Sequence, residues 1–197
     1  MRNYKELIFS FLFGALLGLV AKYLDTVPMI DNSPWHTLAN YFGDLFTRIG
    51  IWVFIAILIA VKSKKIIQAA LNTLLFSLGM LITYYIYSAY LFGFFPTLYF
   101  LEWGKLAIIS PFLAMLAHLA KHDRNLTNTL PALPIGLMLY LSLGFGYLYI
   151  SVKYISEFIM LLVIGKLYYR NPKQIAIVIS LSIILALLLR QYSPYAF

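Results

Sequence analysis

Residues 31–48 read DNSPWHTLANYFGDLFTR and join a turn to a helix that carries polar side chains into an apolar segment. Ser33 is a typical N-cap residue, and Pro34 suits the first helical position because proline lacks only an N–H group that would have no partner there. Each step of four residues advances about 40° around a helix, so side chains at this spacing form one slowly winding stripe. The stripe has four members: His36, Asn40, Asp44 and Arg48. It needs polar partners or water, because the surrounding segment is apolar.

The composition indicates an integral membrane protein. Of the 197 residues, 62% are hydrophobic and 11% are charged, and the mean hydropathy is +0.86. Soluble domains carry about 25% charged residues. The length suits a single transmembrane domain over residues 1–197 that interacts with the lipid bilayer. Because the chain has no cysteine, disulfides, thiolate metal sites and cysteine nucleophiles are excluded.

We predict an all-α, polytopic transmembrane helix bundle of seven spans with a cytoplasmic N-terminus. The spans cover about residues 7–24, 34–61, 67–94, 103–120, 131–149, 153–169 and 174–190. Span 153–169 has only a short uninterrupted apolar stretch, so six spans are the alternative. Pro111 predicts a kink or local break in span 103–120.

The distribution of charge favours seven spans over six. With the N-terminus inside, ten of the fifteen cations face the cytoplasm: Arg2, Lys5, Lys62, Lys64, Lys65, Lys121, Arg124, Lys166, Arg170 and Lys173. If span 153–169 did not cross, the last three would face outward, against the positive-inside rule. The same rule explains the net charge of +8, so no nucleic-acid partner is expected.

The remaining charges gather at the outer ends of the predicted spans. Five are acidic and five are basic: Lys22, Asp25, Asp31, Asp44, Arg48, Glu102, Lys105, Lys153, Glu157 and Arg190. Spacings of three or four residues predict the pairs Asp44–Arg48, Glu102–Lys105 and Lys153–Glu157. Buried charges are costly unless they are paired, and in membrane proteins they mark cavities and pathways. The alternatives are interfacial charges that extend to the headgroups and, for Asp44 and Arg48, a structural ion pair.

These patterns define a candidate outward-facing pocket with apolar walls and polar anchors. Asp44 and Arg48 are its central anchors, and His36 and Asn40 tune it. Tyrosines near the outer end of span 67–94 line it, although tyrosine there is also typical of an aromatic belt. The full candidate set for ligand binding is Asp44, Arg48, His36, Asn40, Lys22, Asp25, Tyr84, Tyr87 and Glu157.

Gly14 and Gly18 form a second candidate surface. Their spacing leaves a groove on span 7–24 through which another helix can approach closely, and ordinary helix packing is its simplest role.

Catalytic motifs are absent from the sequence. His118 and His122 have a spacing at which two ligands can share a metal, but the chain holds three histidines in all, and His36 is predicted on the other side of the membrane. There is no phosphate-binding glycine loop and no intramembrane protease motif. We therefore expect no metal, no cofactor and no catalytic residue.

Asn32-Ser33-Pro34-Trp35 lies between a glycine-rich first span and a long second span. This arrangement resembles a family of small uncharacterised bacterial multi-pass membrane proteins, which have an external Asn-Ser…Trp stretch before their second span. The resemblance covers mainly the first third of the chain and implies a bacterial inner-membrane location. The size and the outward pocket also resemble the substrate-capturing subunits of energy-coupling-factor vitamin transporters, which usually have six helices.

The leading interpretation is a membrane protein that binds a small polar solute from the outer side and takes part in its transport. The alternative is a non-transporting component that packs through the Gly14/Gly18 groove against a partner membrane protein or a second copy. A membrane-embedded enzyme ranks third.

Overall fold

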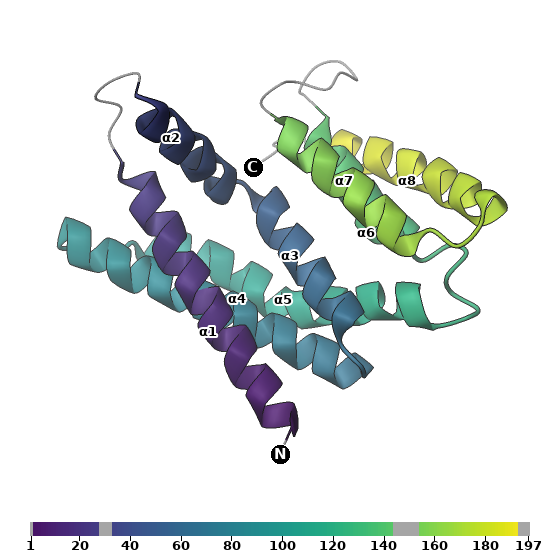
Figure 1. Ribbon diagram of the computed structural model, residues 1–197, viewed down its shortest axis with the longest axis horizontal. Helices are drawn as coiled ribbons and strands as arrows, with labels where there is room; N and C mark the ends of the chain where they lie inside the picture. The colour runs from purple at the N-terminus through teal and green to yellow at the C-terminus, as the bar shows by residue number, and fades with distance from the viewer. Residues whose placement is uncertain (1, 28–32, 144–153, 193–197) are drawn as a thin grey trace.

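The structure is a computed structural model that describes residues 2–27, 33–143 and 154–192. Every regular element in these ranges is an α-helix, which confirms the all-α class. The helices are α1 (Arg2–Asp25), α2 (Pro34–Thr47), α3 (Ile49–Lys62), α4 (Ile66–Phe92), α5 (Thr97–His122), α6 (Ala132–Ser142), α7 (Ile155–Tyr168) and α8 (Pro172–Tyr192). Figure 1 shows their arrangement.

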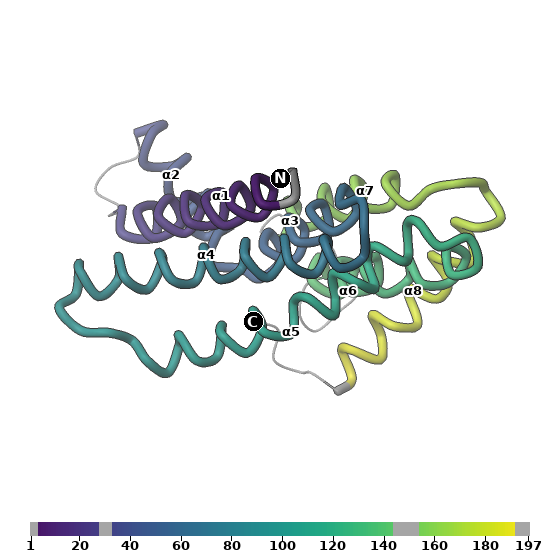
Figure 2. Tube along the Cα trace, turned by 90° about the horizontal axis from the view of Figure 1, so that it is seen from below, coloured from purple at the N-terminus to yellow at the C-terminus, as the bar shows by residue number. Residues whose placement is uncertain are grey.

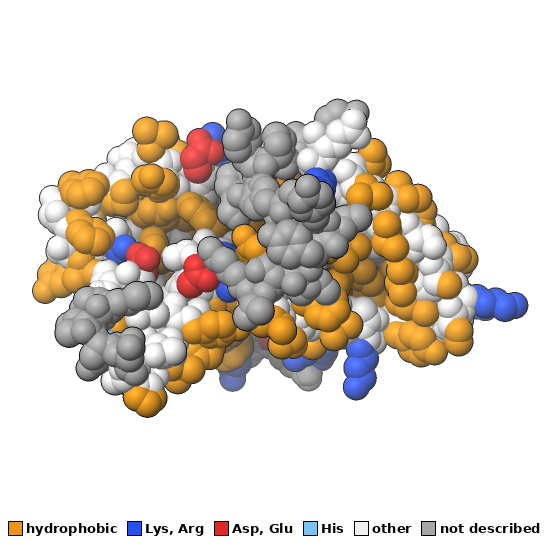
Figure 3. All heavy atoms as spheres, turned by 90° about the horizontal axis from the view of Figure 1, so that it is seen from above, with side chains coloured by type: hydrophobic (Ala, Val, Ile, Leu, Met, Phe, Trp, Pro, Cys, Tyr) orange, Lys and Arg blue, Asp and Glu red, His pale blue; other side chains and the backbone are white. Residues whose placement is uncertain are grey.

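Four of these helices are long and apolar enough to cross a membrane: Tyr4–Asp25, Ile66–Phe92, Thr97–His122 and Pro172–Gln191. Helices α2 and α3 together form a fifth apolar segment, which is bent by 70°. Large apolar side chains such as Phe9, Ile86 and Ile108 are exposed along these helices, as a lipid environment requires. Figure 3 shows apolar side chains over much of the described surface on one face of the molecule.

The predicted continuous helix over residues 34–61 is wrong. Ser33 caps α2 and Pro34 opens it, as expected, but the helix stops at Arg48, whose extended backbone (φ −88°, ψ 142°) separates α2 from α3. Helix α5 begins at Thr97, earlier than expected, and continues as one helix through Pro111, so of the predicted kink or local break the break is not found. Helix α6 ends at Ser142, and residues 144–149 of the predicted span lie outside the described part.

Helix α3 lies at the centre of the molecule. It contacts α2, α4, α5, α6 and α7. Helices α1, α4 and α5 lie side by side, and α6 packs against both α7 and α8 (Figures 1 and 2). The largest apolar core joins α3 and α5 to α6, α7 and α8 through side chains that include Ile57, Met138, Ile164 and Val178.

Glycines bring α1 and α4 into direct backbone contact. A Cβ atom at Gly14 would overlap the carbonyl oxygen of Phe76, and one at Gly18 would overlap that of Met80. Gly79 on α4 meets the carbonyl oxygen of Phe11 in the same way. The groove on α1 is therefore filled by α4 of the same chain. This is the ordinary helix packing that was the simplest expectation for the two glycines, and a partner helix would first have to displace α4.

Candidate functional site

The break at Arg48 directs this side chain into a buried polar cluster. Its Nη1 lies 2.9 Å from Oε2 of Glu157 on α7, and the two side chains are 10% and 2% exposed. Ser156 Oγ donates to the same carboxylate oxygen (3.0 Å) and accepts from Arg48 Nη2 (3.4 Å). Arg48 Nε donates to the backbone carbonyl of Asp44 (3.2 Å), and the guanidinium carbon lies 5.7 Å from the centre of the Tyr154 ring.

Gly50, in the first turn of α3, gives Glu157 the space to reach Arg48. A Cβ atom at this position would lie 2.8 Å from Glu157 Cγ. The carboxylate thus sits beside the amino end of α3, where helix geometry favours negative charge. Burial of two charges is offset only by close pairing and by further hydrogen bonds, and Ser156 and the Asp44 carbonyl supply these here.

The predicted pairs involving these residues are only partly found. Asp44 Oδ2 lies 3.6 Å from Arg48 Nη2, but the Asp44 side chain is 48% exposed, so it lies at the edge of the cluster. Glu157 pairs with Arg48, and the predicted contact with Lys153 stays a prediction because Lys153 lies outside the described residues. Glu102 and Lys105 form their predicted pair at 2.7 Å, and both are exposed.

A second charged cluster lies at the end of α1. Lys22 Nζ is 2.8 Å from Asp25 Oδ2, and the Tyr84 hydroxyl of α4 donates to the same oxygen (3.2 Å). The Lys22 side chain is buried at 6% exposure, and its ammonium lies 5.2 Å from the centre of the Tyr84 ring and 4.7 Å from that of Phe92. Aromatic faces attract cations, so the two rings compensate part of the hydration that the ammonium loses.

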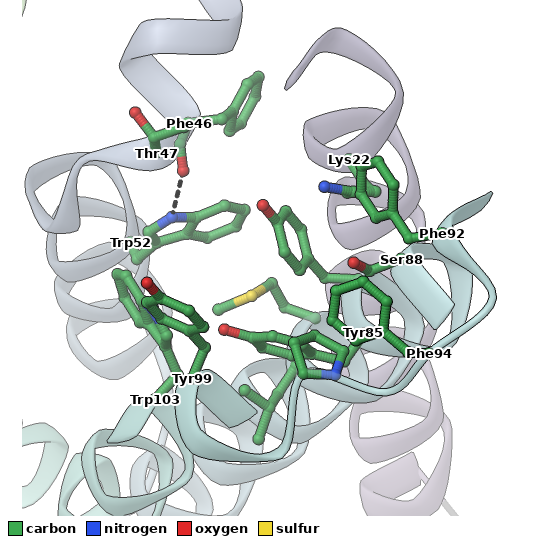
Figure 4. Close-up of a pocket in the computed structure, with 14 residues that line it drawn as sticks. Lys22, Phe46, Thr47, Trp52, Tyr85, Ser88, Phe92, Phe94, Tyr99 and Trp103 are labelled. Atoms are coloured by element: carbon green, nitrogen blue, oxygen red, sulfur yellow. Dashed lines mark hydrogen bonds between the residues drawn. The ribbon is translucent and has the colours of Figure 1, made fainter. Parts of the chain in front are cut away.

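This second cluster borders a cavity of about 350 Å³ between α1, the α2–α3 break, α4 and the start of α5 (Figure 4). Its walls are mostly aromatic. The lining residues are Lys22, Phe46, Thr47, Trp52, Met80, Leu81, Tyr84, Tyr85, Ser88, Phe92, Phe94, Pro96, Tyr99 and Trp103. The Trp52 indole is held in place by donating to the Phe46 carbonyl (2.9 Å). A volume near the lower end of the range for ligand pockets suits a small organic molecule.

The candidate residues therefore divide into two places. Lys22 and Tyr84 line the cavity, whereas Arg48 and Glu157 form the buried cluster that links the α2–α3 break to α7. His36 lies at the start of α2, with Nδ1 2.8 Å from Ser33 Oγ. The Tyr87 ring stacks on that of Tyr90 at 6.5 Å. Neither these residues nor Asn40 are among the cavity-lining residues.

Sequence reasoning missed most of the cavity wall. Trp52, Trp103 and Phe92 lie on three different helices, and no spacing rule joins them. The one available signal was the concentration of aromatic residues, which make up 17% of the chain. That signal could not separate a ligand pocket from an aromatic belt.

His118 and His122 on α5 each place a ring nitrogen beside a backbone carbonyl oxygen. Their rings stack at 4.2 Å, His118 Nδ1 lies 3.1 Å from the Ala60 carbonyl, and His122 Nδ1 lies 3.0 Å from the His118 carbonyl. Within residues 2–27, 33–143 and 154–192, no group of three or more His, Cys, Asp or Glu side chains could hold a metal ion.

The fold and the site define an all-helical protein with four or five apolar segments long enough to cross a membrane and an aromatic cavity at their ends. The chain belongs to the family of unknown function DUF6518, whose model matches residues 1–195. This match covers nearly the whole chain, whereas the resemblance from sequence rested on its first third. No curated protein and no solved structure matches the chain.

Proposed function

We propose that this protein is a multi-pass membrane protein that binds a small solute in the aromatic cavity and takes part in its transport. The observation that carries the proposal is the cavity itself, whose wall combines aromatic faces with the buried ammonium of Lys22. A buried charge in a membrane protein is costly, and such charges usually serve a substrate or ion pathway. Lys22 and Tyr84 take the anchoring role that the sequence assigned to Asp44 and Arg48.

The break between α2 and α3 supports a role in transport beyond binding alone. Phe46 and Thr47 at this break line the cavity, and Arg48 beside them is tied to α7. Interrupted helices at binding sites are a recurring feature of transporters, in which one group of helices moves against another. Movement of α7 relative to α3 would therefore act directly on one wall of the cavity.

We further propose seven spans, a cytoplasmic N-terminus and a bacterial inner-membrane location, with the cavity facing outward. Support comes from the connections between helices: the start of α1 and the α3–α4, α5–α6 and α7–α8 connections lie along one side of the molecule (Figure 1). Basic residues are frequent at these points, including Lys62, Lys64, Lys65, Arg170 and Lys173. The cavity lies toward the opposite side, near the end of α4.

The binding proposal is tested with purified protein in lipid nanodiscs and tryptophan fluorescence. Of the three tryptophans, Trp52 and Trp103 line the cavity, and Trp35 is 58% exposed, so Trp35→Phe removes the background signal. A panel of small organic acids, amines, amides and sugars is titrated. We expect a saturable change with at least one class of solute.

Two variants fill the cavity from different sides: Ser88→Phe on α4 and Thr47→Phe at the exposed end of α2. Both should abolish the signal, whereas Ser180→Phe on an exposed face of α8 should preserve it. No saturable response across the panel, or unchanged binding in both cavity variants, would overturn the proposal. Uptake of the bound solute into proteoliposomes then separates transport from binding alone.

A further inference from the structure

We propose that the solute is a small carboxylate with an aromatic or cyclic body, whose carboxylate pairs with Lys22 while its ring packs between the aromatic walls. This inference rests on the proposed function, because it specifies the ligand of the same cavity. It assigns Lys22 as the residue that determines charge specificity, and the aromatic side chains as those that determine shape.

The first argument is the sign of the charge that faces the cavity. Lys22 is the one charged residue among the described lining residues, and it is 5% exposed. Its partner Asp25 is not part of the lining and is 31% exposed. The ion pair therefore presents its positive member to the cavity and its negative member to the exterior. An anionic group in the cavity would meet the ammonium member of this ion pair first, because Lys22 lines the cavity and Asp25 does not.

The second argument is the unused hydrogen-bonding capacity of the ammonium group. An ammonium carries three N–H donors. Among the described residues, Asp25 Oδ2 is the one acceptor bonded to Lys22 Nζ, and the ammonium otherwise faces the rings of Tyr84 and Phe92. Figure 4 shows the Lys22 nitrogen directed toward the space enclosed by the lining side chains. A bound carboxylate would accept the remaining donors and form a charge-assisted hydrogen bond.

The third argument concerns the body of the ligand. Aromatic rings surround the cavity on several sides: Phe46, Trp52, Tyr84, Tyr85, Phe92, Phe94, Tyr99 and Trp103. Such walls favour flat or apolar groups through offset stacking and edge contacts. Ser88, which also lines the cavity and is 4% exposed, makes no hydrogen bond within the described part of the chain. Its hydroxyl offers one further polar contact to a ligand.

A cationic ligand fits these observations less well. Aromatic cages bind cations, but the faces of Tyr84 and Phe92 already hold the ammonium of Lys22. A second cation in the same small cavity would be repelled, because like charges in a site of low dielectric interact strongly. An amine of the same shape as the acid is therefore expected to be rejected.

The test uses three probes of nearly equal shape: 3-phenylpropionate, 3-phenylpropionamide and 3-phenylpropylamine. They are titrated into Trp35→Phe protein in nanodiscs at pH 7, with fluorescence of the two cavity tryptophans as the readout. The acid and the amide can both accept a hydrogen bond from the ammonium, but only the acid adds a negative charge to that contact, and a tenfold difference in Kd corresponds to about 1.4 kcal/mol. We expect the acid to bind at least tenfold more tightly than the amide, and the amine to bind most weakly.

Lys22→Met removes the charge with little change in volume and should abolish the preference for the acid over the amide, whereas Lys22→Arg should retain part of it. Equal binding of acid and amide, or an unchanged preference in Lys22→Met, would overturn this inference. If the acid and the amide bound equally but Ser88→Phe abolished the binding of both, only the inference about charge would fail, and the proposed function would still stand. Absence of any response to the acid also overturns the inference, and the broader panel then decides whether the cavity binds another solute.

Discussion

Arg48 and Glu157 are separated by 109 positions in the chain, yet Nη1 of one lies 2.9 Å from Oε2 of the other. This pair connects the break between α2 and α3 to α7. It therefore joins the helices around the cavity to α7, which packs with α6. Both side chains are nearly inaccessible, at 10% and 2% exposure. The stability of the molecule should therefore depend on keeping both members or removing both.

Glu157→Met should destabilise the protein strongly, because it leaves the Arg48 guanidinium buried without its carboxylate. Loss of one member of a buried pair costs about 3–5 kcal/mol. The double variant Arg48→Met/Glu157→Met should recover much of this loss, since two apolar side chains can replace a buried ion pair. Chemical unfolding in mixed micelles, followed by tryptophan fluorescence, measures both variants.

The exposed pair of Glu102 and Lys105 provides the matched control for this experiment. Their side chains are 59% and 65% exposed, and pairs of this kind contribute about 0–1 kcal/mol. Glu102→Gln should accordingly leave the unfolding midpoint nearly unchanged. Strictly additive losses in the Arg48/Glu157 double variant would show that the two side chains do not stabilise each other.

Gly50→Ala should destabilise the protein through a clash with Glu157. The added Cβ atom would lie 2.8 Å from Glu157 Cγ, and crowding of this kind costs about 1–3 kcal/mol. In a Glu157→Ala background the clashing atom is gone, so Gly50→Ala should become neutral or even stabilise α3 by up to about 1 kcal/mol. A double-mutant cycle measured by thermal unfolding gives the coupling.

Gly165→Ala on α7 controls for the helix propensity of alanine, because a Cβ atom there meets no other atom within 4 Å. It should be neutral or mildly stabilising. If Gly50→Ala lowered the stability by the same amount with and without the Glu157 side chain, the clash would involve a residue other than Glu157.

Local sequence signals predicted where most helices begin and end, because those signals act within a few residues. Ser33 and Pro34 open α2 as expected, and Gly93, with a positive φ of 72°, ends α4 close to the predicted end of span 67–94. The break at Arg48 was not predicted, since neither glycine nor proline marks it. Its stabilising contact is Glu157, which lies on another helix and leaves no trace in local spacing.

The residues of the candidate site were predicted only in part, because local spacing does not show contacts between distant helices. Lys22, Asp25 and Tyr84 all belong to the predicted ligand-binding set, and the structure brings these three side chains together. Their role in binding stays a prediction. The spacing of Asp44 and Arg48 also predicted a contact, but the buried Glu157 forms the closer one. Which aromatic side chains enclose a cavity depends on how α1, α3, α4 and α5 pack, and periodicity within one helix does not specify this.

Gly14→Leu should prevent α1 from packing against α4 and so destabilise the isolated protein. The added side chain would occupy the position of the Phe76 carbonyl, which is backbone and cannot move without shifting α4. Thermal unfolding at low protein concentration measures the effect, with Leu16→Phe on the exposed face of α1 as the control; Leu16 is 58% exposed. Normal unfolding together with loss of a bound partner would instead support a groove used between proteins.

Single cysteines should reveal the topology, because the native chain contains none. In the proposed seven-span arrangement, a membrane-impermeant maleimide labels Lys105→Cys and Ile155→Cys in intact cells, and it labels Lys64→Cys and Arg170→Cys only after permeabilisation. If neither α6 nor α7 crosses, Ile155→Cys becomes inaccessible from outside while the labelling of the other three cysteines is unchanged.

If only one of these two helices crosses, Arg170→Cys is labelled from outside. Lys166, Arg170 and Lys173 would then face outward, against the positive-inside rule. Labelling of Lys64→Cys in intact cells would reverse the orientation altogether, and the cavity would then open toward the cytoplasm.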